Sequence, residues 1–149
     1  MREKTEKWLE KWLIQLIYIQ VWAGALGSLY FSQVLKLPPC SLCITQRFLM
    51  YPLVIIISVG LWKRDKNLPY YVLPFSILGL IVAGYHNLIY WHVISDSLVP
   101  CSVQLPCTVK DFSLLGFVTI PLMSFAAFLL VTVGTIIWLK LDRMINKGR

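Results

Sequence analysis

The chain has 149 residues, of which 58% are hydrophobic and only 14% are charged. Typical globular domains are about a quarter charged, and a soluble protein of this size could not bury so much apolar surface. The composition therefore excludes an ordinary soluble domain and predicts a single membrane domain over residues 1–149. The net charge of +7 comes mainly from three short basic segments, a pattern typical of membrane proteins, so no nucleic-acid partner is expected.

Four apolar stretches each approach the roughly 20 residues that a helix needs to cross about 30 Å of hydrocarbon. They cover residues 12–37, 44–62, 70–91 and 114–139. Helices are expected because every backbone polar group in lipid must be hydrogen-bonded within its own segment. The first stretch is too long for a cleaved signal peptide and is expected to be an anchor. The sequence thus predicts an all-α membrane protein, a four-transmembrane-helix bundle in contact with membrane lipid.

The basic residues predict the orientation of this bundle. They gather before the first stretch, between the second and third, and after the fourth (Arg2, Lys4, Lys7, Lys11; Lys63, Arg64, Lys66; Lys140, Arg143, Lys147, Arg149). The positive-inside rule places these segments, and with them both termini, in the cytoplasm. Loops 38–43 and 92–113 then face outside and carry all four cysteines. Disulfides persist outside the cytosol, so this topology agrees with a redox role for the cysteines.

Cys40 and Cys43 form a C-x-x-C at the junction of the first and second stretches. A helix that starts near Cys43 would put that sulfur at the positive end of its dipole, which favours the nucleophilic thiolate. Arg47 follows four residues later, on the same helical face and one turn deeper. A charge inside a membrane span is costly and usually functional. Arg47 is therefore predicted to stabilise a thiolate or a bound oxyanion, with contact to lipid headgroups as the alternative.

Cys101 and Cys107 enclose five residues of the second outer loop. A turn of that length can bring two cysteines to disulfide distance, and such an exposed bridge is expected to be labile rather than structural. Two alternatives stay open for the four cysteines: two structural disulfides, or one four-sulfur zinc site. Zinc ligands favour gaps of two to four residues, so the gap of five argues against zinc and no metal is predicted.

His86 lies inside the third stretch, toward its outer end, and His92 lies just beyond it. An intramembrane histidine is either packed and hydrogen-bonded within the bundle or takes part in chemistry. In the second case His86 would bond or protonate a polar headgroup near Arg47. His92 is interpreted as an interfacial residue.

The sequence C-S-L-C-I-T-Q-R at 40–47, followed by M-Y-P-L at 50–53, resembles the DsbB/BdbC family of disulfide-bond formation proteins. The segments 27–32 and 116–121 and the Cys101/Cys107 pair resemble it too, so the match runs from about residue 22 to 130. The short gap in the second pair is more similar to the BdbC branch than to the DsbB branch.

This resemblance implies a thiol:quinone oxidoreductase in a bacterial cell membrane, with both cysteine pairs on the extracytoplasmic face. A thioredoxin-fold thiol oxidase, DsbA- or BdbD-like, would attack the Cys101–Cys107 disulfide. Electrons would pass to Cys40–Cys43 and then to a quinone, menaquinone or ubiquinone, and so support disulfide formation in exported proteins. Cys43 would be the quinone-facing thiolate, Arg47 would polarise the quinone oxygen, and His86 is a further quinone-site candidate.

Gln46 stands where some members of the DsbB branch have an acidic residue, so no proton transfer is assigned to it. Two other functions remain open. One is a quinone reductase similar to vitamin K epoxide reductase, in which the C-x-x-C usually follows a later span. The other is a non-enzymatic small membrane subunit or transporter with structural disulfides.

Overall fold

The computed structural model of the chain describes residues 2–36, 40–94, 113–114 and 118–147. The described part contains four helices, each with a stretch long and apolar enough to cross a membrane, which confirms the predicted four-helix membrane protein. Two very short strands precede the last helix. The elements in chain order are α1 (Arg2–Gln33), α2 (Ser41–Lys63), α3 (Leu68–Tyr90), β1 (Ser113–Leu114), β2 (Val118–Thr119) and α4 (Ile120–Lys147).

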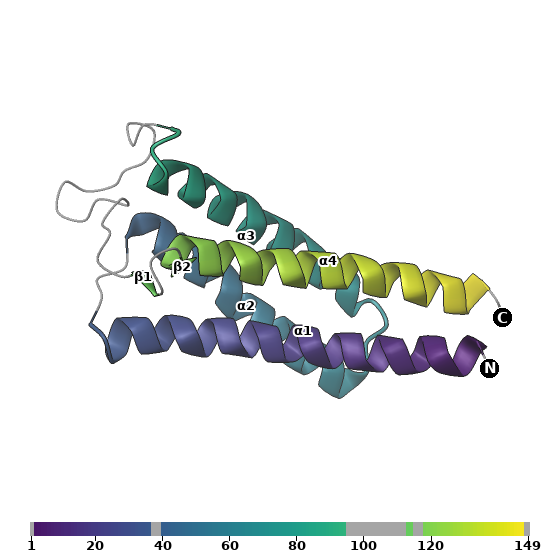
Figure 1. The fold of residues 1–149 in the computed structure, drawn as a ribbon. Coiled ribbons are helices and arrows are strands. Elements are labelled where there is room, and N and C mark those ends of the chain that lie inside the picture. Colours follow the sequence, from purple (N-terminus) through teal and green to yellow (C-terminus); the bar gives the residue numbers. More distant parts are fainter. Residues whose placement is uncertain (1, 37–39, 95–112, 115–117, 148–149) are drawn as a thin grey trace.

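The helices form a bundle in which α1 packs against α2 and α4, and α3 packs against the same two helices. Figure 1 shows both chain ends beside the turn between α2 and α3. The junction of α1 with α2 and the start of α4 lie at the opposite end of the bundle. The C-x-x-C therefore lies at the end remote from the termini, and the side of the membrane that each end faces remains a prediction.

Several helix boundaries differ from those expected from hydropathy, and the end of α1 and the start of α4 are two of them. Helix α1 ends at Gln33, before the predicted residue 37, and Lys36 adopts a left-handed backbone with φ 50°. Prolines follow this point, and a residue before proline is disfavoured in a helix. Helix α4 begins at Ile120 rather than at 114, because β1 and β2 pair antiparallel just before it.

Core packing depends on one close approach between α3 and α4. Phe128 of α4 is 1% exposed and its ring lies over Gly79 of α3, where any Cβ atom would overlap the ring. Packing of this kind, with a small residue on one helix, drives association in lipid because the hydrophobic effect between helices is absent there. Gly79 thus sets the distance between the two helices.

Two hydrogen bonds from polar side chains join α4 to its neighbours, one at its start and one in its second half. Asn87 of α3 donates from Nδ2 to the carbonyl of Pro121 at 2.9 Å, which holds the start of α4. In the second half, Nε1 of Trp138 donates to Oε1 of Glu10 on α1 at 3.0 Å. Because α4 is fixed against α3 and α1, the residues near its start keep a defined position beside α2.

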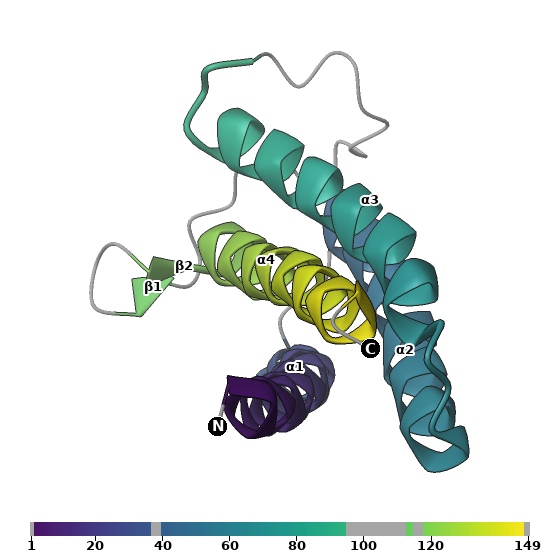
Figure 2. The ribbon, with the colours of Figure 1, turned by 90° about the vertical axis from the view of Figure 1, so that its right-hand side faces the viewer.

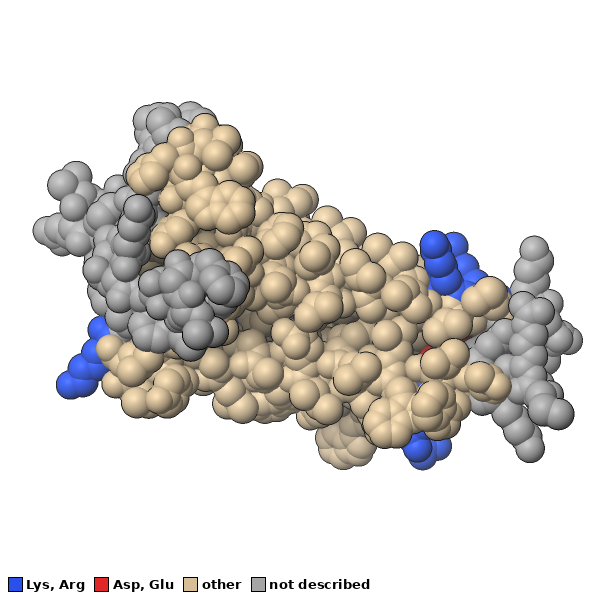
Figure 3. Space-filling model, in the orientation of Figure 1, with Lys and Arg blue, Asp and Glu red and all other residues tan. Residues whose placement is uncertain are grey.

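The outward face of the bundle is apolar. Large side chains such as Phe48, Ile55 and Ile81 are more than half exposed, as expected of residues that contact lipid rather than water. On the face shown in Figure 3, the lysines and arginines of the described part lie toward the two ends. This distribution suits a bundle whose middle lies in hydrocarbon.

Candidate redox-active site

Helix α2 begins at Ser41, so Cys40 and not Cys43 occupies its N-cap. The backbone of Cys40 is extended, with φ −69° and ψ 168°. Its Sγ accepts a hydrogen bond from the backbone N–H of Cys43 at 3.4 Å. This is the usual arrangement of an N-cap side chain, and it places the Cys40 sulfur at the positive end of the helix dipole. The helix starts slightly earlier than predicted, so Cys40 takes the N-cap, and Cys43, the third residue of the helix, lies in its first turn as well.

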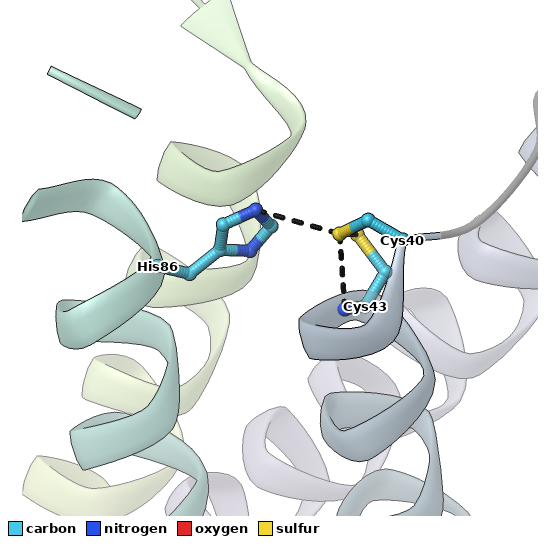
Figure 4. Close-up of side chains that lie close together, drawn as sticks. All are labelled: Cys40, Cys43 and His86. Carbon is cyan, nitrogen blue, oxygen red and sulfur yellow. Dashed lines mark hydrogen bonds between the residues drawn. The ribbon is translucent and has the colours of Figure 1, made fainter. Parts of the chain in front are cut away.

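The two sulfurs form a reduced pair in contact with one imidazole. The Sγ atoms of Cys40 and Cys43 lie 3.2 Å apart, within hydrogen-bonding distance. Nε2 of His86 lies 3.7 Å from Sγ of Cys40. Figure 4 shows the imidazole reaching from α3 toward the sulfurs at the start of α2. A long-range contact thus joins α3 to the C-x-x-C.

The pKa of the Cys40 thiol is lowered to about 4. The largest cause is a hydrogen bond from the Cys43 side chain, and the hydrogen bond with His86 and the backbone N–H of Cys43 act in the same direction. Burial opposes them, because it disfavours the charged form. Cys40 is therefore a thiolate at neutral pH when the pair is reduced, and the thiolate is the reactive form of cysteine.

His86 is itself held by a buried polar chain. The imidazole is 2% exposed, and its Nδ1 lies 3.3 Å from Nε2 of Gln46. On the other side, the Ser124 hydroxyl donates to Oε1 of Gln46 at 2.7 Å. Gln46 comes from α2 and Ser124 from α4, so three helices contribute to the surroundings of Cys40. Buried polar groups of this kind require partners, and these residues supply them to one another.

Cys43 and Arg47 line a cavity of about 280 Å³ between α1, α2 and α4. Nη2 of Arg47 donates to the backbone carbonyl of Ser28 on α1 at 3.0 Å. A guanidinium has five N–H donors, so Arg47 can bond Ser28 and still donate into the cavity. The other residues that line it are mostly small or apolar and include Ala23, Gly24, Gly27, Phe31, Met50, Met123 and Ala127.

The distances within the C-x-x-C suit a dithiol better than a zinc site. Sulfur and nitrogen atoms of Cys40, Cys43 and His86 lie within 4.8 Å of one another. Two thiolates at about 2.3 Å from a tetrahedral zinc ion would be about 3.8 Å apart. The observed sulfur–sulfur distance of 3.2 Å is shorter and is that of two groups sharing a proton.

The structure brings four of the predicted site residues together: Cys40, Cys43, Arg47 and His86. His86 contacts Cys40 and is not among the residues that line the cavity beside Arg47. His92 is exposed, with φ 56°, just after the end of α3. The predicted pair Cys101 and Cys107 lies outside the described residues, as does most of the second outer loop.

Sequence reasoning did not assign a role in the site to Gln46 or Ser124. Gln46 lies three residues after Cys43, which puts it on the buried face of α2, and that spacing was a usable signal. Ser124 offered none, because its partner is 78 residues away in the sequence.

Comparison with known proteins identifies the family. The sequence model of the protein family described as disulfide bond formation protein DsbB matches residues 10–138 of this chain. The chain belongs to the DsbB family. A relative in Bacillus cereus named probable disulfide formation protein C 2 is 37% identical over 137 residues, which cover 92% of this chain and 96% of the relative. Disulfide bond formation protein C of Bacillus subtilis is 37% identical over 122 residues, or 82% of this chain and 84% of the relative.

These findings confirm the resemblance to the DsbB family and its BdbC-like branch. Membership implies oxidoreductase activity in disulfide formation, and the four apolar helices make the chain a multi-pass membrane protein of that family. No solved structure gave a match to the chain.

Proposed function

We propose that this DsbB-family protein is a thiol:quinone oxidoreductase that reoxidises a thioredoxin-fold thiol oxidase outside the cytoplasm. The single observation that carries the proposal is that Cys43 and Arg47 line one largely apolar cavity, which Cys40 does not line. Cys40 would then be the sulfur that receives the incoming electrons.

The cavity suits the ring of a membrane quinone, whether menaquinone or ubiquinone. Its volume of about 280 Å³ is near the lower end of the range usual for small-molecule sites, about 300–1,000 Å³, as expected for a flat ring system. Gly27 of α1 faces open space, whereas the space beside Gly24 is filled by Met50. The ring would contact Phe31 and Met50. Such a site is lined by apolar groups with a few polar ones that fix orientation.

When bound, a quinone supplies a two-electron, two-proton acceptor. The residues around the cavity would hold it for that purpose. Arg47 would donate a hydrogen bond to a ring oxygen, where negative charge develops, and Ser28 would keep the guanidinium in place through its carbonyl. The Cys43 sulfur would face the ring. The reduced pair, a Cys40 thiolate and a Cys43 thiol, would lose two electrons and one proton as its disulfide forms, and the second proton that the quinone takes up would come from solvent.

The electrons would reach this pair through Cys101 and Cys107. The partner's dithiol attacks the Cys101–Cys107 disulfide and leaves as a disulfide, and the two new thiols reduce Cys40–Cys43 in the same way. Each exchange forms one S–S bond and breaks another, so electrons and atoms balance and only the quinone accepts electrons at the end. Disulfide formation in exported proteins would follow from the oxidised partner.

The test is oxidation of a purified thioredoxin-fold dithiol protein by membranes that contain quinone. Cys40→Ser and Cys43→Ser are each expected to abolish it. Arg47→Met is expected to raise the quinone concentration needed for half-maximal rate by about tenfold or more, the value of a hydrogen bond from a charged donor. Lys63→Met, which removes a charge at the far end of α2, is the matched control and should leave that concentration unchanged.

If Arg47→Met needed the same quinone concentration for half-maximal rate as the wild type, the cavity beside Arg47 would be excluded as the quinone site. If the wild-type protein oxidised no dithiol but reduced quinone at the expense of a dithiol reductant inside the cell, the reductase alternative would hold instead. Activity that persists in both serine variants would favour the structural-disulfide alternative.

A further inference from the structure

A continuous chain of hydrogen bonds leads from α4 to the Cys40 sulfur. It runs from the Ser124 hydroxyl to Gln46, from Gln46 to His86, and from His86 to Cys40, with distances of 2.7, 3.3 and 3.7 Å. We propose that Ser124 and Gln46 are positioning residues that hold His86 with its Nε2–H aimed at the Cys40 sulfur. This inference rests on the proposed dithiol oxidation and adds two residues to it.

The direction of each hydrogen bond follows from the first one. Because the Ser124 hydroxyl donates to Oε1 of Gln46, the NH₂ end of the amide faces His86. An amide NH₂ has donors and no free lone pair, so Nδ1 of His86 must accept. A neutral imidazole carries one proton, which then resides on Nε2, the atom that contacts Cys40.

Burial makes this arrangement specific. His86 is 2% exposed and Gln46 is 6% exposed. Ser124 is half-buried and lines the cavity beside Arg47, as does Gln46. His86 does not line that cavity, so water is poorly placed to replace a partner lost by its ring, and a buried polar group without a partner is costly. If the Gln46 amide turned around, its NH₂ would face Ser124, and Nδ1 of His86 would have to carry the proton. A serine hydroxyl can also accept, so Ser124 favours the observed arrangement by donating to Oε1 of Gln46 rather than by excluding the other one.

With its proton on Nε2, His86 is oriented in advance to stabilise negative charge on the Cys40 sulfur. Opening the Cys40–Cys43 disulfide with two electrons breaks the S–S bond and leaves charge on sulfur. A donor that already points at Cys40 stabilises that charge without reorganisation, which is the general advantage of a preorganised site. Without Gln46 and Ser124, the imidazole could present either its N–H or its lone pair to the sulfur.

Few other groups act on Cys40. Among the described residues, the titratable side chains beside it are Cys43 on α2 and His86 on α3, and the fixed charge of Arg47 lies one turn deeper on α2. The described parts of α1 and α4 bring no charged side chain to it. A change in the titration of Cys40 on substitution of Gln46 or Ser124 can therefore be traced to His86.

The first measurement is the tautomer of His86 in the oxidised protein, where no thiolate can dictate it. The chain has two histidines. His92→Gln, at the exposed one, leaves His86 as the only source of imidazole ¹⁵N signals in detergent micelles. The expected result is one tautomer, Nε2–H, and a mixture of two in Gln46→Met and in Ser124→Ala. Ser58→Ala is the matched control, because that hydroxyl donates within α2 to Val54.

The second measurement is the pH dependence of Cys40 alkylation in the reduced protein, followed on the Cys40 peptide by mass spectrometry. Gln46→Met and Ser124→Ala are expected to raise the midpoint by about one pH unit, the size of one hydrogen bond to a charged group. Ser58→Ala should not move it. Unchanged helicity and thermal unfolding would show that the variants are folded.

An Nδ1–H tautomer in the wild type would overturn the proposal, as would a single Nε2–H tautomer that survives both substitutions. Neither measurement needs a quinone or a partner protein. Failure here is therefore distinct from failure of the proposed function, which would appear as lost dithiol oxidation with an intact tautomer and midpoint.

Discussion

At the scale of single residues, the two cysteines of the C-x-x-C differ because one caps a helix. Cys40 accepts the Cys43 N–H and contacts His86, whereas Cys43 lies in the first turn of α2 and lines the cavity. Stabilising a thiolate stabilises the reduced pair, which makes the corresponding disulfide a stronger oxidant. This asymmetry suits a pair that must take electrons from another dithiol.

The cysteines, Arg47 and His86 could be predicted because their residue types are rare and costly in a membrane span. Gln46 and Ser124 could not be assigned roles, since such side chains commonly join transmembrane helices without further function. Their importance depends on which atoms face each other across α2, α3 and α4. The spacing of Gln46 from Cys43 indicates its helical face, but the contacts of both residues are known only from the packing.

The first prediction concerns the reactivity of Cys40. Because its pKa is lowered to about 4, the thiolate is fully formed well below neutral pH. The rate of alkylation of Cys40 in the reduced protein should therefore stay flat from about pH 6 to 8, whereas an ordinary thiol of pKa about 8.5 gains nearly tenfold per unit. Cys43→Ala removes the hydrogen bond that contributes most to the lowered pKa of Cys40, so the alkylation rate should then rise with pH. Cys43→Ser keeps a hydroxyl donor, so the rate should rise less steeply in that variant. A tenfold rise per unit in the wild type would contradict the assignment.

At the scale of helices and strands, hydropathy predicted how many spans there are but not where they end. The α1 and α4 boundaries depend on the prolines, on the left-handed Lys36 and on the pairing of β1 with β2. Two-residue strands have too few side chains to produce a periodic signal, so the segment before α4 was assigned to the span. The start of α2 at Ser41 has the largest consequence, because it makes Cys40 the N-cap residue.

The second prediction concerns the α3–α4 contact. Gly79→Ala places a methyl group against the ring of Phe128, and overpacking of a filled core costs about 1–3 kcal/mol. Gly84→Ala is the matched control on α3, since its Cβ would meet Phe125 at 3.5 Å, an ordinary contact. Thermal unfolding in detergent should show a lower midpoint for Gly79→Ala alone.

Phe128→Leu should restore part of that loss when it is combined with Gly79→Ala, because a smaller side chain leaves room for the methyl group. Such non-additivity is expected of residues in direct contact. Equal unfolding midpoints for Gly79→Ala and Gly84→Ala would mean that the approach of α3 to α4 does not depend on Gly79.

At the scale of the whole molecule, the described fold separates two ends. The start of α2, the end of α3 and the start of α4 lie at one end, which therefore carries the C-x-x-C and His86. Both termini lie at the other end with the α2–α3 turn. The bundle was predictable from composition and charge, since four long apolar segments in this order have few other ways to satisfy their backbone polar groups. Which end faces outward follows only from the basic residues, so it remains an inference about the membrane and not about the fold.

The last prediction tests that orientation. In a variant with serine at all four cysteine positions, a single cysteine is introduced either by Val93→Cys, at an exposed position just after α3, or by Asp65→Cys, in the turn between α2 and α3. A membrane-impermeant maleimide added to intact cells should label the first and should reach the second only after permeabilisation. Basic residues flank Asp65 on both sides, and moving them across the membrane would oppose the charge bias that sets topology. Labelling of Asp65→Cys in intact cells would place the C-x-x-C in the cytoplasm, where disulfides are rare, and would leave the proposed oxidase without an extracytoplasmic partner.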